Sequence, residues 1–175
     1  DRIKENVKIK SSDSYISKTY KSVISEDISF DKIKKKLEMY TENMSTADLL
    51  YRADEIDIKK SEIAKVHEEI VNYMFNKIFV SVKWNETEFK QVQNILNSLL
   101  VIDEDKAILI SAVTISLLHV FDDKKFMLLL SSCRDDKILI STRALVGLII
   151  ILQINHKVVN YYPEILAQLS MLKDD

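Results

Sequence analysis

At 175 residues, with 25 basic and 27 acidic side chains and a net charge of −2, the chain has the balance of a folded domain. This excludes wholesale disorder and a strong overall attraction to nucleic acid or to anionic membranes. A single Gly and a single Pro argue against an all-β fold, which uses both residues in turns, and against a nucleotide-binding α/β fold, which needs a glycine-rich loop.

The remaining class is an all-α protein. Within it, the first 56 residues are expected to form less regular helices. Apolar residues between Tyr15 and Ile24 recur at helical spacing. The segment SFDKIKKKLEMY predicts a helix capped by Ser29, with Lys34 and Lys35 on its polar face. Acidic residues are interleaved with these lysines, which favours a solvated helix face over an anion-binding patch.

Three further helix starts and one long helix follow along the chain. Ser45 and Asp48 form a variant of the capping box and predict a short separate helix. Residues 56–82 carry apolar side chains in the i, i+3, i+4, i+7 order of one long helix. Asn85 and Glu88 predict a capping box for the next helix, and Asp103 is expected to cap the one after that.

Two apolar helices are similar to each other and indicate an internal repeat. The segment DKAILISAVTISLL, from Asp105, aligns with DKILISTRALVGLI, from Asp136, and each is followed by a polar break and a second helix. An inner helix of such a stack is covered by neighbouring repeats, which explains why it is apolar on most sides. Small residues at matched positions, Ser116 and Gly147, are expected to let the adjacent helix approach closely.

The apolar content of the last long helix makes a membrane span the alternative. A span needs about 20 apolar residues, whereas Arg143 on one side and Gln153 on the other leave only residues 144–152 uninterrupted. We therefore expect a soluble helical array and no membrane span.

The segment DDKILISTRALVGLIIIL resembles the inner part of a HEAT-type repeat, and residues 103–172 are similar to helical-repeat regions of large bacterial proteins that combine HEAT-like and tetratricopeptide-like arrays. The resemblance implies an α-α superhelix of antiparallel helix pairs over residues 57–175, preceded by the less regular helices of residues 1–56. It also implies that Asp105 and Asp136 are turn acids and that Arg143 is the basic position of a charge ladder. Ala112 stands at the equivalent position of the preceding unit, so the ladder is incomplete.

The inventory of chemically active side chains predicts no enzyme, no cofactor and no metal site. His67, His119 and His156 are dispersed, and no Cys pair or Cys/His spacing suits zinc. His119 is expected to be a satisfied core or edge histidine. Cys133 is alone and excludes an internal disulfide, which fits a reducing, cytoplasmic location.

Arg143, Tyr161 and Tyr162 are the candidate partner-binding residues of the C-terminal half. The first interpretation of Arg143 is a pair with Asp105 or Asp136, because a buried arginine must find a charged partner. The second is that it binds a carboxylate of a partner. Tyr161 and Tyr162 precede Pro163, the expected first residue of a helix, and exposed tyrosines favour interfaces.

The predicted function is a non-catalytic helical-repeat scaffold that binds a protein. A chain that begins DRIKEN without Met is expected to be part of a longer protein, so further repeats of the parent chain are expected partners. The alternative is an all-α nucleic-acid-binding module that uses the lysine-rich N-terminal helices, with Lys34 and Lys35 as candidate contacts. Nucleic acid is the less favoured partner because of the interleaved acidic residues.

Overall fold

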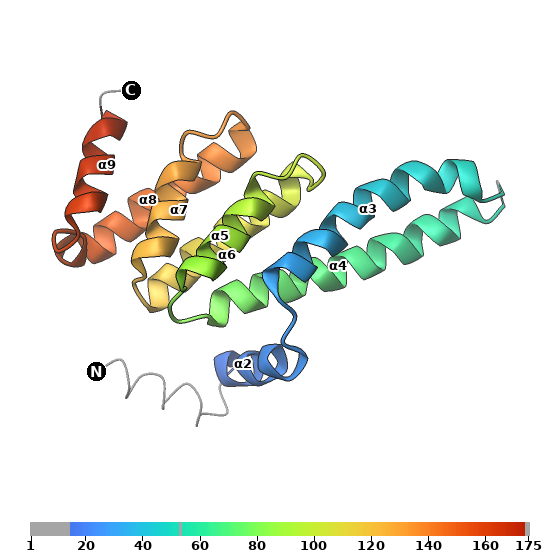
Figure 1. The fold of residues 1–175 in the computed structure, drawn as a ribbon, viewed down its shortest axis with the longest axis horizontal. Coiled ribbons are helices and arrows are strands. Elements are labelled where there is room, and N and C mark those ends of the chain that lie inside the picture. Colours follow the sequence, from blue (N-terminus) through green and yellow to red (C-terminus); the bar gives the residue numbers. More distant parts are fainter. Residues whose placement is uncertain (1–14, 53, 174–175) are drawn as a thin grey trace.

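The computed structural model describes residues 15–52 and 54–173, and over these ranges the chain folds into helices without a strand (Figure 1). The all-α class is therefore confirmed. In chain order the helices are α2 (Tyr15–Glu26), α3 (Phe30–Leu50), α4 (Ile56–Val80), α5 (Glu86–Leu96), α6 (Asp103–His119), α7 (Asp123–Ser132), α8 (Ile138–Val159) and α9 (Pro163–Lys173). The predicted boundary at residues 56 and 57 falls at the start of α4, between two helices that pack along each other.

Apart from α2, which packs against α4, the described helices lie in two rows. One row contains α4, α6 and α8, with α6 packed between the other two, and the second contains α3, α5, α7 and α9 (Figure 1). Neighbours in the first row are parallel: His67 of α4 meets Asp105 at the start of α6, and Ser81 after α4 meets Ser116 near the end of α6. The chain thus returns to the same side of the molecule after each pair of helices.

The second row follows the same rule. Asp31 at the start of α3 accepts a hydrogen bond from Gln91 of α5, and Glu38 further along α3 accepts one from Ser98 just after α5. Since both contacts progress in the same direction along the chain, α3 and α5 are also parallel.

Several helix starts follow the predicted capping chemistry. Ser29 caps α3 by accepting a hydrogen bond from the amide of Lys32. Asn85 and Glu88 form a complete capping box at α5, with both hydrogen bonds at 2.9 Å. Pro163 is the first residue of α9, where its missing N–H costs nothing.

Other predicted boundaries are wrong. Ser45 does not start a new helix: α3 continues through it, and its hydroxyl donates to the carbonyl of Thr41 at 2.7 Å. Asp103 does not cap α6 but is its first residue, after Ile102 in the cap position. The Ser45 hydroxyl thus bonds to the preceding turn of its own helix, as a serine inside a helix can do.

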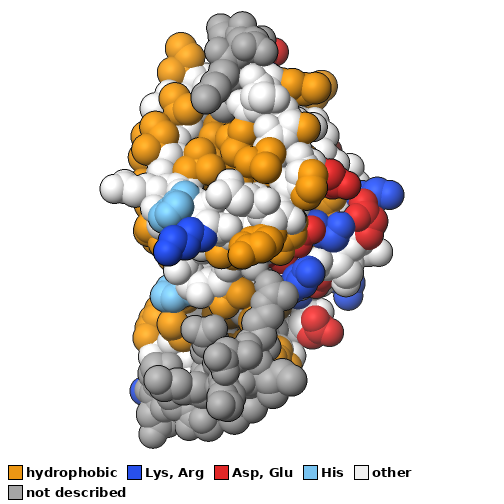
Figure 2. All heavy atoms as spheres, turned by 90° about the vertical axis from the view of Figure 1, so that its left-hand side faces the viewer, with side chains coloured by type: hydrophobic (Ala, Val, Ile, Leu, Met, Phe, Trp, Pro, Cys, Tyr) orange, Lys and Arg blue, Asp and Glu red, His pale blue; other side chains and the backbone are white. Residues whose placement is uncertain are grey.

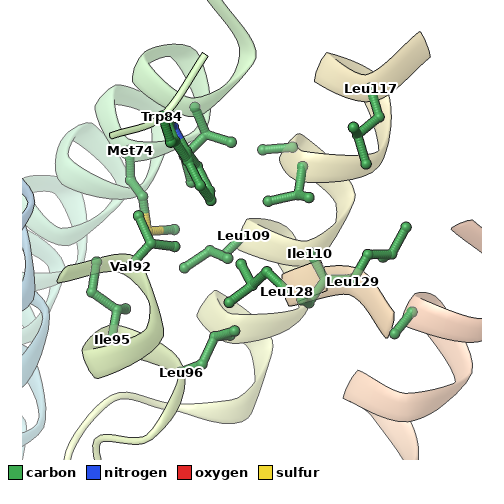
Figure 3. Close-up of a cluster of buried hydrophobic side chains, with 14 of the residues drawn as sticks. Met74, Trp84, Val92, Ile95, Leu96, Leu109, Ile110, Leu117, Leu128 and Leu129 are labelled. Carbon is green, nitrogen blue, oxygen red and sulfur yellow. The ribbon is translucent and has the colours of Figure 1, made fainter. Parts of the chain in front are cut away.

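A continuous apolar core fills the space between the two rows. Met74 from α4 and Trp84 from the following connector meet Val92 of α5, Leu109 of α6 and Leu128 of α7 (Figure 3). Trp84 is buried and its ring lies edge-on to Phe30. The core therefore links all the central helices.

Gly147 allows α8 to approach α6 closely, as predicted from its position as a small residue that matches Ser116 in the internal repeat. A Cβ atom added at Gly147 would lie 2.3 Å from Thr114 Oγ1 and 3.3 Å from Leu129 Cδ1. The Thr114 side chain is short and branched, and its hydroxyl donates to the carbonyl of Ile110 at 3.0 Å, so it has little freedom to move aside.

We expect Gly147→Ala to lower the free energy of unfolding by about 1–3 kcal/mol through overpacking, although alanine is the better helix former by about 1 kcal/mol. Thr114→Ala should relieve the clash, so the double variant should be at least as stable as Thr114→Ala alone. Chemical denaturation of the four proteins measures this cycle, with Thr142→Ala as an exposed control on α8. A Gly147→Ala protein more stable than the wild type would contradict the close approach.

A buried ammonium group joins α7 to the connector after α4. Lys125 is fully buried, and its Nζ donates to the hydroxyl of Ser116 at 2.7 Å and to the carbonyl oxygens of Ile78 and Ser81. It also lies 5.2 Å from the centre of the Trp84 ring. Burial lowers the pKa of Lys125 to about 8, against the opposing effect of nearby carboxylates.

Asp122, the fully buried cap of α7, completes this arrangement. One carboxylate oxygen accepts the amide N–H of Lys125 at 3.0 Å, and the other accepts the amide N–H of Trp84 at 2.8 Å. The two residues therefore fix the end of α4, the connector and α7 to one another.

Candidate interaction surface

A shallow groove between α6 and α8 contains Arg143, the residue that the sequence singled out. The groove has a volume of about 300 Å³. We call it the α6–α8 groove, and it is lined by Ser111, Thr114, Ile115, Thr142, Arg143, Val146, Gly147 and Ile150. The close approach of the two helices at Gly147 forms its floor.

Arg143 is exposed, and its Nη1 donates to the hydroxyl of Ser111 at 2.8 Å. The predicted pair with Asp105 or Asp136 is wrong, since Asp105 bonds to His67 of α4 instead and no carboxylate in residues 15–52 or 54–173 pairs with Arg143. The prediction assumed that Arg143 is buried, but α8 is open to solvent on this side. Its guanidinium therefore keeps most of its donors for other ligands.

Exposed aliphatic side chains occupy more than one face of α8: Val146 and Ile150 line the α6–α8 groove, whereas Leu145 and Ile149 line a separate cavity against α9. Figure 2 shows hydrophobic side chains gathered over the α8 and α9 end of the molecule, whereas many acidic and basic side chains gather at one edge of the same view. The exposed large apolar residues of α6 and α8 are Ile115, Leu118, Ile138, Leu139, Leu145, Val146, Ile149, Ile150, Ile154 and Val158. Large exposed apolar areas of this kind mark interaction sites.

By length and composition, α8 is the one described helix that could cross a membrane. Its mean hydropathy reaches 1.9 over an 18-residue window, of which 28% is buried inside the fold. The helix as a whole is more apolar than the short uninterrupted run between Arg143 and Gln153 indicated. One side of α8 packs on α6 and α7. The absence of a membrane span stays a prediction.

The two tyrosines before α9 differ in their surroundings. Tyr161 is exposed, whereas the ring of Tyr162 lies 5.4 Å from that of Phe121 and packs against the core. Tyr162 also lines a cavity of about 560 Å³ with Phe89 and Lys124. Tyr162 therefore covers the core, and Tyr161 alone presents its ring to solvent.

The candidate lysines are not brought to the α6–α8 groove. Lys34 lies 3.5 Å from Glu38, four residues along α3, and Lys35 is exposed on the same helix. In Figure 1, α3 and the turn before α9 lie at opposite ends of the row of helices. The predicted site residues therefore belong to separate surfaces.

His119 and Cys133, which the sequence offered as chemically active side chains, lie in ordinary structural positions. His119 is exposed beside the ring of Phe79, at 5.3 Å, so it is an edge histidine. Burial raises the pKa of Cys133 to about 11, which keeps the thiol protonated at neutral pH. Among the residues that the structure describes, no three His, Cys, Asp or Glu side chains are grouped to hold a metal ion.

The sequence did not predict that the apolar residues of the groove face solvent. Val146 and Ile150 lie on α8 at helical spacing with Arg143 and Thr142, and this combination of polar and apolar side chains on one face was the available signal. The repeat hypothesis placed all these residues against a neighbouring helix.

Comparison of the chain with protein families, with curated proteins and with solved structures gives no match.

Proposed function

We propose that the chain is a non-catalytic scaffold built as a HEAT-like α-α superhelix, and that it binds a protein at the α6–α8 groove. The parallel order of α4, α6 and α8 supports the superhelix, because stacked antiparallel helix pairs place equivalent helices parallel to each other. The proposal of binding rests on the exposed aliphatic side chains around Arg143, which pairs with no carboxylate in the described part of the chain.

The groove favours a partner segment with apolar side chains and at least one carboxylate. Val146 and Ile150 offer aliphatic contacts, and Arg143 can bind a carboxylate through two parallel hydrogen bonds. An amphipathic helix laid into a groove between two helices uses this combination. The partner is therefore expected to be an acidic amphipathic segment of another protein.

Capture from native lysate of the source cell tests the proposal. Wild-type protein and the Val146→Asp variant are immobilised in parallel at moderate salt, and the retained proteins are compared quantitatively by mass spectrometry. We expect Val146→Asp to reduce a defined set of retained proteins by at least roughly tenfold, because it places a carboxylate in the apolar contact beside Arg143.

Ile58→Asp is the matched control, because Ile58 on α4 is an aliphatic residue exposed to 62%, close to the 52% of Val146. It should leave the retained set unchanged. Equal losses in both variants would contradict a specific role of the groove. Retention of nuclease-sensitive nucleic acid that falls steeply with salt would instead favour the lysine-based alternative.

A further inference from the structure

A second groove, between α3 and α4, contains an imidazole supported by a buried carboxylate. His67 Nε2 and Asp105 Oδ2 form a hydrogen bond of 2.7 Å, in which the ring donates to the ionised carboxylate, and Asp105 is almost completely buried at the start of α6. The ring of Tyr40 is stacked on the imidazole, with the centroids 3.8 Å apart and the planes 16° from parallel. Together these contacts fix the position and the orientation of the His67 ring.

The fixed ring lines the groove, and the contact with Asp105 leaves its other nitrogen, Nδ1, unused. His67 is one of the lining residues of this groove, whose volume is about 370 Å³. Within the described part of the chain no protein group bonds to His67 Nδ1. This atom accepts a hydrogen bond when the ring is neutral and donates one when it is protonated. A carboxylate only accepts hydrogen bonds, so it is the protonated ring that bonds to one through Nδ1.

The rest of the groove is apolar with a cationic rim. Its walls include the exposed aliphatic side chains of Met39 and Val66. Of the two charged lining residues, Glu62 is paired with Lys59 at 2.9 Å, whereas Lys36 has no carboxylate partner among the residues that the structure describes. The uncompensated charge of the rim is therefore positive.

We propose that the α3–α4 groove binds a small aliphatic carboxylate, with the carboxylate between Lys36 and His67 and the aliphatic chain against Met39, Tyr40 and Val66. Small-molecule sites combine an apolar lining of this kind with a few polar groups that fix orientation, at volumes from about 300 Å³ upward. The net positive rim selects an anion over a cation, and the apolar walls select an aliphatic chain over a compact polar anion. This site is independent of the α6–α8 groove.

Titration with octanoate, octanol and octylamine tests the proposal, because the three probes share one chain and differ in the head group. Binding is followed by ¹H–¹⁵N NMR of the whole chain. We expect saturable shifts centred on residues 36–43 and 62–70 with octanoate, and binding at least roughly tenfold weaker for the other two. Equal binding of the three probes, or octanoate shifts confined to α8, would overturn the proposal, as would no saturable binding of octanoate.

Two exposed substitutions keep the test independent of folding. Lys36→Ala should weaken octanoate binding roughly threefold to tenfold through the lost ion pair, whereas Lys35→Ala, one residue away and outside the groove lining, should not change it. Val66→Asp should abolish saturable binding by placing a carboxylate against the chain. Unchanged affinity in Lys36→Ala and Val66→Asp would show that the carboxylate binds elsewhere.

Discussion

Asp122→Ala is expected to lower the free energy of unfolding by about 3–5 kcal/mol. Asp122 is fully buried and accepts the amide N–H groups of Trp84 and Lys125. Alanine leaves both buried donors without a partner and removes the cap of α7. It also removes the negative charge that acts most strongly on the buried ammonium group of Lys125.

Asp123→Ala is the matched control for this prediction. Asp123 is the next residue, is partly exposed, and is 3.7 Å from Lys83 in a surface ion pair. Its removal should change the free energy of unfolding by less than about 1 kcal/mol. Urea denaturation at pH 7 measures both variants, and similar losses in the two would show that the buried carboxylate does not hold α7 to the connector.

Lys125 should make the protein more stable as the pH rises from 8 to 10.5. Burial lowers the pKa of this lysine from 10.5 to about 8 in the folded protein. Between these values the unfolded chain binds the proton that the folded protein has released, so the free energy of unfolding increases with pH. At about 1.4 kcal/mol per unit, the increase approaches roughly 3 kcal/mol.

Comparison with Lys125→Met isolates this contribution, because methionine removes the titrating group and keeps an unbranched apolar side chain. Stability is measured at several pH values from 7.5 to 10 for the wild type, Lys125→Met and Lys65→Met, an exposed control on α4. The wild type should gain on Lys125→Met as the pH rises and should stay parallel to Lys65→Met. Parallel curves for all three proteins would mean that Lys125 titrates as an exposed lysine does.

Local signals in the sequence predicted much of the helical architecture. The caps at Ser29 and Asn85 are local hydrogen bonds between residues three apart, so the sequence alone contains them. Gly147 was informative because it is the only glycine in the chain. Ser45 misled the prediction, because a serine inside a helix can bond to the preceding turn and then gives no sign of a boundary.

The polar groups of the interior depend on contacts far apart in the chain and could not be assigned in the same way. Lys125 meets Ser81 from another helix pair, and His67 meets Asp105 from the next one. Helical spacing did offer a partial signal: Lys125 lies four residues before the buried Leu129, and His67 lies three residues before the buried Ile70. A charged or polar residue on such a face is expected to be buried, but its partner follows only from the packing of distant helices.

Arg143 shows the opposite case. Its place in an apolar helix indicated burial and a carboxylate partner, whereas α8 lies at the side of the described helices with its outer face exposed. Whether a helix of a stack is covered depends on what lies beyond it, which the local sequence does not contain.

Methyl NMR of the isoleucine, leucine and valine side chains with a protein retained in the capture experiment tests the central claim most directly. If the α6–α8 groove is the binding surface, the methyl signals of Ile115, Val146 and Ile150 shift on titration, while those of Ile24 and Ile58, which are more open to solvent on α2 and α4, stay in place. Shifts confined to α2, α3 and α4, with unchanged signals from α6 and α8, would contradict the proposed surface and move binding to the lysine-bearing helices.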